Sequence, residues 1–515
     1  MLAPSTKPRR RRNHKTPRRS RQNRAAKIHT PTYITRKIPV YELLNEEGLQ
    51  RLDDHADWIL SDVGIEFRGD NEALKLFKAA GATVQGSRVR FDKGHARTLC
   101  ATAPREFKMF GRNPARTTTF GGNRVIFAPA YGPPFVSDIK HGRRYGTIKD
   151  FENFVKLTYL SPWLQHGSGT LCEPVDIPVN KRHLDMVYAH LRYSDKPFMG
   201  GVTAHERAQD SVEMARLVFG DDFMAQNCVI QGNINVNSPL VYDEVMSGAL
   251  RVYAAANQGL VISPFILGGA MSPVTMGAAL AQAHAEAMVG IALSQLVQPG
   301  CPVVYGNFLT TMDLKTGAPT FGTPESSLAA QAIGQLARRL GLPFRCGGHY
   351  TASKVADGQA MQESADSMMA GLMAGANFIF QAAGWLEGGL TIGYEKFVMD
   401  ADHCGILNRY LQGLNLDENH LGADAFQEVG SGGNFLGSRH TLANFRSANH
   451  RSELADNNSF EQWTEAGRHD MEQRAYERWK AMLKAYEAPP LDPAIDEALK
   501  AFIRKKKDGM PDEWY

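Results

Sequence analysis

A short apolar run that ends near glycine or asparagine recurs along most of this 515-residue chain. From the second run onward, a helical pattern follows each one, such as GAALAQAHAEAMVGIALSQL after the fifth run. The later runs begin roughly 30 to 42 residues apart, which is the length of one strand–helix unit. The eight runs are VIFAPAYG, WLQHGSG, PFMGGVT, CVIQGNIN, LVISPFILGG, PVVYGNF, PFRCGGHY and NFIFQAAGW.

Eight strands that alternate with helices predict an α/β fold with parallel pairing, and a closed (β/α)8 TIM-type barrel accounts for the number. Glycines at the ends of the strands fit such a barrel, because the backbone turns sharply at its C-terminal rim. A doubly wound open sheet is the main alternative. No G-x-G-x-x-G follows the first strand, so the sequence offers no support for a dinucleotide site.

The composition changes along the chain predict four regions. Residues 1–35 are a disordered basic tail, residues 36–120 an N-terminal helical and hairpin region, residues 121–415 the barrel, and residues 416–515 a C-terminal loop and helical extension. Residues 1–27 hold eleven Lys or Arg and no acid. Since no aromatic residues are interleaved for stacking on bases, a solvated tail is favoured over a nucleic-acid contact.

Several features predict a cytoplasmic protein. The chain is 43% hydrophobic, but no window approaches about 18 uninterrupted apolar residues, so we expect no membrane span. No apolar stretch follows the basic start, so no secretory signal is visible. The six cysteines are scattered without a C-x-x-C pair, which argues against a zinc ribbon or a disulfide framework and suits a reducing compartment. We expect no metal site.

The predicted strand ends present aromatic and amide side chains rather than an acid–base pair. Trp and Tyr at neighbouring strand ends can surround an onium group by cation–π attraction, worth about 2 kcal/mol per desolvated ring. A glutamate beside them can add a counter-charge, although the same rings can also simply cap the core. We therefore predict a substrate-binding set that consists of Tyr305, Asn307, His349, Tyr350, Trp385 and Glu387. Other strand-end residues are Tyr131, His166, Asn233, Asn235, Gly268 and Gly269.

Four long stretches closely resemble the trimethylamine methyltransferase family. They are GGAMSPVTMGAALAQAHAEAMVGIALSQLVQPGCPVVYGNF, FGTPESSLAAQAIGQLARRLGLPFRCGGHYTASKVADGQA, GLTIGYEKFVMDAD and EVGSGGNFLGSRHT. The resemblance runs from about residue 40 to the C-terminus. It implies a (β/α)8 barrel and transfer of a methyl group from an amine to a corrinoid.

Within this family, members that act on trimethylamine contain pyrrolysine, whereas this chain has only standard residues. The resemblance therefore implies a pyrrolysine-free, glycine betaine methyltransferase-like member that demethylates a quaternary amine. A quaternary nitrogen leaves as a neutral tertiary amine, so no proton donor is required. The segment CGGHYTASK departs from the betaine-specific pattern, which leaves the donor open among betaines, carnitine-like compounds and sulfonium compounds.

The corrinoid-binding pattern D-x-H-x-x-G does not occur in the chain, so the resemblance implies that a separate protein carries the corrinoid (cobalamin). We expect that partner to approach the glycine-rich loop at Gly432, Gly433 and Asn434. Tetrahydrofolate is the alternative acceptor. A non-catalytic onium-binding barrel is the contrasting class of function, and the C-terminal helix can serve a homo-oligomer.

Overall fold

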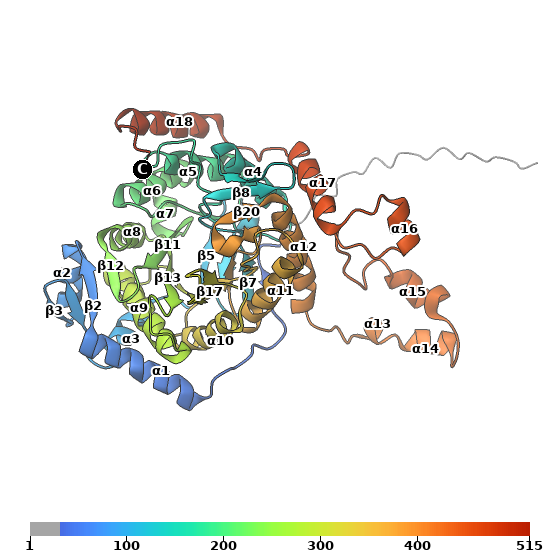
Figure 1. Ribbon diagram of the computed structural model, residues 1–515, viewed down its shortest axis with the longest axis horizontal. Helices are drawn as coiled ribbons and strands as arrows, with labels where there is room; N and C mark the ends of the chain where they lie inside the picture. Colours follow the sequence, from blue (N-terminus) through green and yellow to red (C-terminus); the bar gives the residue numbers. More distant parts are fainter. Residues whose placement is uncertain (1–30, 515) are drawn as a thin grey trace, which may run out of the picture.

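The computed structural model of the protein describes residues 31–514 (Figure 1). Most of the predicted basic tail, residues 1–35, lies outside the described residues. Its last two residues form β1 (Ile34–Thr35), which pairs antiparallel with β7 (Arg124–Phe127). The tail boundary is therefore a few residues too late, because the chain already belongs to the central sheet at Ile34.

The fold is a mixed α/β structure built on one curled sheet of parallel strands. From β7 onward the strand order is β7-β18-β17-β14-β13-β11-β10, and every neighbouring pair in that run is parallel. The strands other than β7 are β10 (Phe198–Met199), β11 (Ile230–Val236), β13 (Gly259–Gly268), β14 (Val303–Gly306), β17 (Phe344–Gly347) and β18 (Phe378–Phe380). These strands confirm seven of the eight predicted runs.

The second predicted run, WLQHGSG, is not a regular strand. Its backbone nevertheless bridges the two edges of the parallel run: the N–H of His166 donates to the carbonyl of Phe127, and the N–H of Met199 donates to the carbonyl of Ser168 at 2.8 Å. The N–H of Gly167 also donates to the carbonyl of Pro197. Ser168 has a φ of 61°, so the chain turns out of the extended conformation there and no continuous ladder forms.

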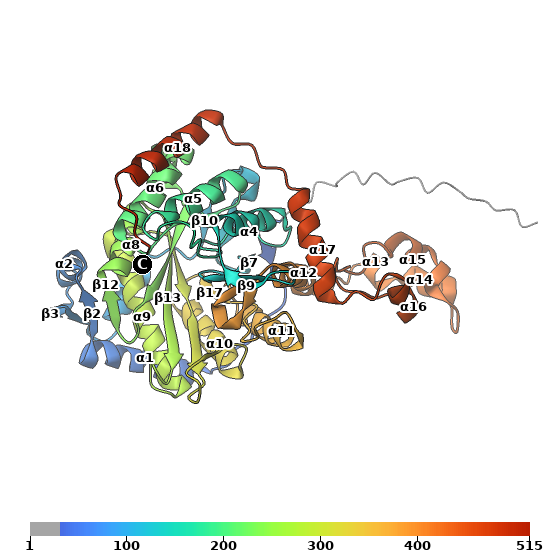
Figure 2. The same ribbon diagram turned by 45° about the horizontal axis from the view of Figure 1, so that its top comes forward.

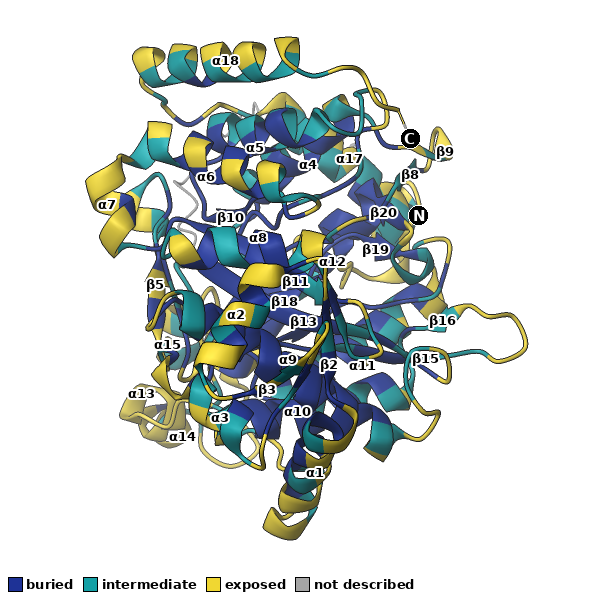
Figure 3. Ribbon diagram, turned by 90° about the vertical axis from the view of Figure 1, so that its left-hand side faces the viewer, coloured by how far each residue is buried: buried dark blue, intermediate teal, exposed yellow. Residues whose placement is uncertain are grey.

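The predicted helices alternate with the strands and cover the outer face of the sheet, as Figures 1 and 3 show. They are α5 (Arg182–Tyr193), α6 (His205–Phe219), α8 (Glu244–Ala255), α9 (Met276–Val297), α10 (Pro324–Arg339), α11 (Gly358–Met373) and α12 (Tyr394–Leu411). Helix α4 (Ile148–Leu160), which was not predicted, precedes the segment at Trp163. Within residues 31–514, only α9 is long and apolar enough to cross a membrane, but 83% of its most apolar window is buried. It is a core helix packed on β13, β14, α8 and α10.

The N-terminal region packs against this body instead of standing apart. Helix α1 (Glu46–Trp58) begins at the Asn45 cap and runs into a π turn, η1 (Ile59–Val63), that ends at Gly64. The predicted hairpin is β3 (Thr83–Gln85) and β4 (Arg88–Arg90). Its sheet also contains β2 (Ile65–Arg68) and β12 (Val241–Asp243), a strand from the predicted barrel region. The remaining elements are α2 (Asn71–Ala79), α3 (His95–Leu99) and η2 (Cys100–Thr102).

Additional elements lie at both ends of the strands. The hairpin of β5 (Phe107–Met109) and β6 (Thr118–Phe120), with η3 (Pro114–Arg116) between them, supplies Phe107, Met109 and Phe120 to the apolar inner cluster. At the C-terminal ends of the strands lie β8 (Phe135–Asp138), β9 (Gly142–Tyr145), β15 (Phe308–Met312), β16 (Pro319–Thr320), β19 (Trp385–Leu386), η4 (Glu387–Gly389) and β20 (Thr391–Gly393). Helix α7 (Asp221–Gln226) precedes β11.

The C-terminal region divides into an arm and two helices that pack on the body. The arm, residues 414–450, contains α13 (Glu418–Leu421), α14 (Ala423–Val429), η5 (Phe435–Gly437) and α15 (Arg439–Asn444), and it stands away from the body in Figures 1 and 2. After α16 (Phe460–Glu465), α17 (Met471–Lys484) packs on α12 and α4. Helix α18 (Pro493–Asp508) packs on α5 and α6.

Candidate active site at the C-terminal ends of the strands

The inner face of the curled sheet changes from apolar to polar along the strands. Its apolar part includes Ile126, Val261, Val304 and Phe378, which pack together with the β5–β6 hairpin. A side chain added at Gly232 would meet Tyr253 of α8, so the neighbouring Gln231 and Asn233 of β11 point the opposite way, to the inner face. Polar side chains therefore follow the apolar layer toward the strand ends.

Arg345 of β17 is the main charged group on this inner face and is 2% exposed. Its Nη1 donates to Ser263 Oγ at 3.1 Å and to the Asn307 carbonyl at 2.7 Å, and its Nη2 donates to Gln381 Oε1 at 3.2 Å. The guanidinium carbon lies 4.2 Å from the Phe380 ring centroid. Burial lowers the pKa of Arg345, but a guanidinium keeps its charge in proteins.

Four aromatic rings gather above Arg345 at the strand ends. Trp385 lies 5.2 Å from Tyr350 and 5.3 Å from Phe321, measured between ring centroids. Phe308 lies 5.8 Å from Tyr350 and 6.2 Å from Trp385. Gly347 makes this arrangement possible, because a side chain there would collide with the ring and hydroxyl of Tyr350. We call Phe308, Phe321, Tyr350 and Trp385 the aromatic cluster.

Of the predicted substrate-binding residues, the structure brings only Tyr350 and Trp385 together in this cluster. Asn307 lies on the adjoining strand end, where its carbonyl holds Arg345 and its Oδ1 accepts the N–H of Leu309 at 3.1 Å. Phe308 and Phe321 complete the cluster. The sequence analysis selected neither residue: Phe308 closes the predicted run PVVYGNF, and Phe321 lies outside all the predicted runs.

Tyr305 and His349 point to the helical layer instead. The Tyr305 hydroxyl lies 3.0 Å from Nδ1 of His284 on α9, and the other ring nitrogen of His284 lies 2.9 Å from Asp53. His349 Nδ1 lies 2.8 Å from the carbonyl of Ala382, and its Nε2 lies 2.8 Å from His403 on α12. Burial, followed by the neighbouring His403 and Lys396, holds the pKa of His349 well below its usual value.

Glu387 lies at the rim but already has partners. Arg143 of β9 binds both of its carboxylate oxygens, at 2.7 and 3.1 Å, and the Thr391 hydroxyl donates to it at 2.7 Å. Burial would raise the pKa of Glu387, but these hydrogen bonds outweigh that effect and leave the pKa lowered. The Arg143 guanidinium also lies 3.4 Å from the Phe135 ring centroid, so the pair fixes β8, β9 and η4 together.

The other strand-end residues fall on the inner face. Tyr131 is half-buried, with its ring centroid 6.1 Å from that of Phe380, and His166 packs edge-on against Phe378. Burial lowers the pKa of His166 well below its usual value. Asn233 donates to Asn235 at 3.3 Å. Gly269, which ends β13 together with Gly268, has a φ of 98°, a conformation that favours glycine and lets the chain turn toward α9.

Several buried polar atoms around this site have no hydrogen-bond partner among residues 31–514. These atoms are Nε of Arg345, the hydroxyl of Tyr350, Nε1 of Trp385, Oδ1 of Asn233, both side-chain polar atoms of Gln231 and Nε2 of His166. Buried polar groups in native proteins are almost always hydrogen-bonded, and unpaired ones call for a ligand or another explanation. Such a concentration on one inner face marks the strand ends as the candidate site.

The loops that surround this site carry exposed apolar side chains. Each side chain belongs to a segment that follows a strand end, and we call the set the apolar rim. Its members are Ile139, Tyr145, Val175, Val274, Leu314, Val355 and Leu390. Exposed apolar patches of this kind mark interaction sites.

The predicted partner loop, Gly432, Gly433 and Asn434, lies in the arm, away from the rim. Helix α12 starts near the strand ends and finishes at Leu411, whose carbonyl accepts the N–H of Lys37 near the opposite end of the sheet. The arm departs from there. In Figure 3, α13 and α14 accordingly lie on one side of the molecule, while β15 and β16 lie on the other.

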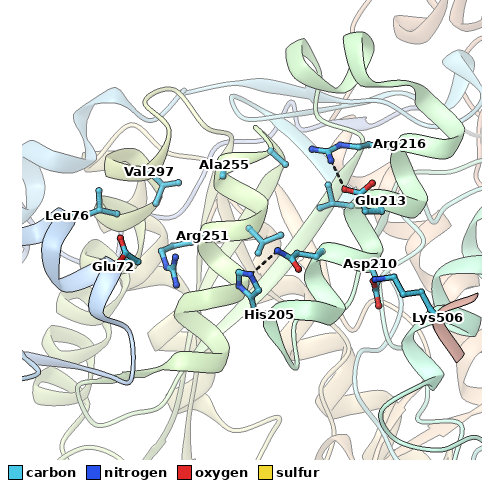
Figure 4. Close-up of a pocket in the computed structure, with 14 residues that line it drawn as sticks. Glu72, Leu76, His205, Asp210, Glu213, Arg216, Arg251, Ala255, Val297 and Lys506 are labelled. Carbon is cyan, nitrogen blue, oxygen red and sulfur yellow. Dashed lines mark hydrogen bonds and ion pairs between the residues drawn. The ribbon is translucent and has the colours of Figure 1, made fainter. Parts of the chain in front are cut away.

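A cavity of about 710 Å³ lies elsewhere, on the outer surface between α2, α6 and α8 (Figure 4). Its charged side chains are paired with each other or with neighbours: Arg216 with Glu213, Arg251 with Asp70, and Lys506 with Asp210. None of the aromatic cluster lines it. The described residues, 31–514, hold no group of three or more His, Cys, Asp or Glu suited to a metal ion.

Besides Phe308 and Phe321, the sequence analysis missed Arg345 and Gln231. A signal was present, because each is a polar residue inside an otherwise apolar strand, in PFRCGG and CVIQGN. Such a strand is buried on both faces, and a charged side chain is rarely buried there unless a partner or a ligand binds it.

Comparison with known proteins places the chain in a family. The family model for trimethylamine methyltransferase matches residues 9–511. The glycine betaine methyltransferase of Desulfitobacterium hafniense is 38% identical over 92% of this chain and 99% of its own length. The trimethylamine methyltransferase MttB of the same species is 28% identical over 90% of this chain and 94% of its own length.

The crystal structure of the Methanosarcina barkeri monomethylamine methyltransferase aligns over 88% of this chain and 97% of its own, with 12% identity and a TM-score of 0.47. The family match and the 38% identical relative each span nearly the whole chain. The chain is therefore a methyltransferase that belongs to the trimethylamine methyltransferase family.

Proposed function

We propose that the enzyme removes a methyl group from a betaine-type quaternary amine and transfers it to the Co(I) corrinoid of a separate protein. The aromatic cluster carries this proposal. It offers several ring faces at the strand ends, and a cation enclosed by such rings gains about 2 kcal/mol or more from each desolvated ring. The 38% identity to a glycine betaine methyltransferase supports the same class of donor.

For this reaction the protein has to orient the donor and stabilise its positive charge. The methyl carbon leaves the quaternary nitrogen, the electron pair of the broken C–N bond stays on nitrogen, and the methyl carbon bonds to Co(I). The departing tertiary amine is neutral, so no proton has to be supplied. Trp385 and Tyr350 would hold the onium group with one methyl turned outward, and Phe308 and Phe321 would exclude water around it.

We propose that the corrinoid protein, a second substrate of this enzyme, docks on the apolar rim. The rim surrounds the site on which the methyl group must be presented, and its side chains are exposed in the chain alone. The loop at Gly432, Gly433 and Asn434 stays a proposed contact, but its place on the arm means that only an arm from another copy can bring it to the rim. Tetrahydrofolate is the alternative acceptor.

We propose that the curled sheet is a closed (β/α)8 barrel, with residues 163–169 as its eighth strand. The hydrogen bonds from this segment to Phe127 on one side and to Pro197 and Met199 on the other support closure. The regions 36–120 and 416–515 are then extensions around one barrel that is formed by residues 121–415. The pairing of β12 with β2 supports a single unit.

We also propose that the arm joins two copies of the chain. It exposes eight large apolar side chains: Leu414, Leu416, Leu421, Phe426, Phe435, Leu436, Leu442 and Phe445. Together they offer on the order of 1,000 Å² of apolar surface, against the roughly 800 Å² per partner that a stable interface buries. Sedimentation at micromolar concentration should show a dimer or larger species; a 57 kDa monomer would refute this contact.

The location is proposed to be the cytoplasm, where the methyl donor and a reduced corrinoid protein would meet. All six cysteines are buried as free thiols, which suits a reducing compartment.

Product analysis tests the proposed reaction. The purified enzyme would be given glycine betaine with either Co(I) cobalamin or tetrahydrofolate, and dimethylglycine would be followed by proton NMR. We expect dimethylglycine only with the corrinoid acceptor. If dimethylglycine formed only with tetrahydrofolate, the acceptor would be a folate and not a corrinoid. If dimethylsulfoniopropionate reacted and no betaine did, the donor would be a sulfonium compound.

A further inference from the structure

Arg345 carries a buried positive charge that no acidic side chain neutralises. It is among the largest fully buried side chains, and no carboxylate among residues 31–514 lies within 4.0 Å of it in an ion pair. By contrast, Lys396 of α12, a buried cation near the site, is paired with Asp400 at 2.6 Å. A buried charge without a counter-ion is costly. A bound anion would offset this cost.

The hydrogen bonds of Arg345 leave an edge available for that anion. A guanidinium has five N–H donors. Three hydrogen bonds, to Ser263, Asn307 and Gln381, fix the group in place, whereas Nε has no acceptor in the described part of the chain. The Nε–H and a neighbouring Nη2–H are parallel donors, which is the pattern that binds a carboxylate through two hydrogen bonds.

The neighbours of this edge are polar and equally unsatisfied. The Tyr350 hydroxyl and the side chains of Gln231 and Asn233 are buried on the same inner face, and each has at least one atom without a partner between residues 31 and 514. A carboxylate placed there would accept hydrogen bonds from a hydroxyl or an amide as well as from Arg345. The arrangement places unpaired polar atoms on the inner face of the sheet, beside the aromatic cluster.

The distance between the two parts limits the ligand. The guanidinium carbon of Arg345 lies 5.3 Å from the Phe308 ring centroid, and that ring lies 5.8 Å from Tyr350 and 6.2 Å from Trp385. A small molecule can therefore contact Arg345 and the aromatic cluster at the same time only if its anionic and cationic groups are a few bonds apart.

We propose that Arg345 binds the carboxylate of the methyl donor, which makes the donor a short zwitterion with a carboxylate and an onium group. This assignment rests on the proposed function. It assigns carboxylate recognition to Arg345 of β17 and not to His349, whose two ring nitrogens face Ala382 and His403. Choline, tetramethylammonium and trimethylamine lack the anion and would leave Arg345 unpaired, so the site discriminates against them.

Titration calorimetry of the unmodified enzyme tests this assignment without any methyl acceptor. The three ligands are glycine betaine, choline, and 3,3-dimethylbutyrate, which keeps the carboxylate and replaces the quaternary nitrogen with carbon. We expect choline to bind at least about 30-fold more weakly than glycine betaine, and 3,3-dimethylbutyrate to compete with it. Choline binding as tightly as glycine betaine, or no competition by 3,3-dimethylbutyrate, overturns the proposal.

Variants give the second readout. Arg345→Gln should lower the affinity for glycine betaine and for 3,3-dimethylbutyrate by at least about 30-fold, and Arg345→Lys should lower both affinities less. Arg216→Gln, on the exposed face of α6, should change neither affinity. Unchanged affinity in a folded Arg345→Gln enzyme refutes the assignment. If that variant does not fold, Arg345→Lys and the unmodified enzyme decide the question.

The two proposals can fail separately. Arg345-dependent binding of glycine betaine without methyl transfer to any acceptor would refute the proposed reaction and leave the carboxylate site standing. Methyl transfer from choline as fast as from glycine betaine would refute the carboxylate site and leave the reaction standing.

Discussion

The rings of Tyr350 and Trp385 lie 5.2 Å apart with their planes inclined at 62°. Two rings at such an angle form a corner, and a corner presents more than one π face to a cation placed within it. Tyr350 follows β17 and Trp385 follows β18, which are neighbours in the sheet. The parallel pairing of two strands therefore builds the central feature of the proposed donor site.

Replacing Trp385 with leucine should raise the KM for glycine betaine by roughly 10- to 100-fold, because it removes one cation–π face. Trp385→Phe keeps a ring in place and should lose much less. Steady-state kinetics with both variants measure the difference, with circular dichroism as the check of folding. Equal losses in the two variants would show that Trp385 acts through packing and not through its ring.

Polar substitutions in the apolar rim should weaken binding of the corrinoid protein and leave binding of the donor unchanged. We expect Leu314→Ser combined with Leu390→Ser to raise the KM for the corrinoid protein by roughly 10-fold or more, since exposed apolar side chains at an interface can each contribute about 1 kcal/mol. Transfer to free cobalamin and the affinity for glycine betaine should not change.

Leu217→Ser on α6 is the matched control for the rim, because Leu217 is an exposed leucine far from the strand ends in sequence and on another face. A similar loss of partner affinity in the control, or no loss in the rim variant, would remove the rim from the docking surface.

Tyr305→Phe should reduce stability and leave donor binding intact. The lost hydroxyl would leave His284 without its partner on one side, in a buried chain that continues to Asp53 and Arg339. An unpaired buried polar group costs about 1–3 kcal/mol. Urea unfolding and the KM for glycine betaine would be measured together. A Tyr305→Phe enzyme that is as stable as the unmodified enzyme but binds the donor poorly would show that Tyr305 belongs to the donor site.

Stability should fall with rising pH through the titration of Glu286 on α9. Burial raises the pKa of this carboxyl to about 7, although Ser238, Leu240 and Gln282 donate hydrogen bonds to it. The folded protein then holds the proton more tightly than the unfolded chain does. The contribution to stability is complete below the unfolded pKa near 4.5 and is lost as the pH rises to about 7.

The expected loss across that window is about 3 kcal/mol in the free energy of unfolding. Urea unfolding of the unmodified enzyme and of Glu286→Gln at pH 5, 6, 7 and 8 would measure it. The difference in stability between the two proteins should shift in favour of the variant as the pH rises. A difference that does not change with pH would mean that Glu286 is ionised in the folded protein throughout.

Much of the fold followed from the sequence because its signals are local. Strand β13 and helix α9 both lie within a residue or two of their predicted bounds, since an apolar run and a glycine pair mark one and an uninterrupted alanine-rich pattern marks the other. The segment at Trp163 differs, because Ser168 turns the chain where the apolar run predicted a strand. That turn depends on tertiary neighbours and not on the run itself.

The candidate site was predictable only in part, because position along a strand does not reveal which face a side chain takes. Tyr305 and Trp385 both stand at strand ends, but Tyr305 faces α9 whereas Trp385 faces the aromatic cluster. One residue of register separates these outcomes. Arg345 shows the converse: its burial and missing counter-ion become visible only when the neighbouring strands are in place.

Visible spectroscopy of a Co(I) corrinoid protein mixed with the enzyme tests the proposed reaction most directly. With glycine betaine present, the Co(I) absorption should disappear and the spectrum of the methylated corrinoid should replace it, at a rate that depends on enzyme concentration; with choline, the Co(I) spectrum should persist. A Co(I) spectrum that stays unchanged with glycine betaine and with every other carboxylate-bearing onium compound would contradict the account.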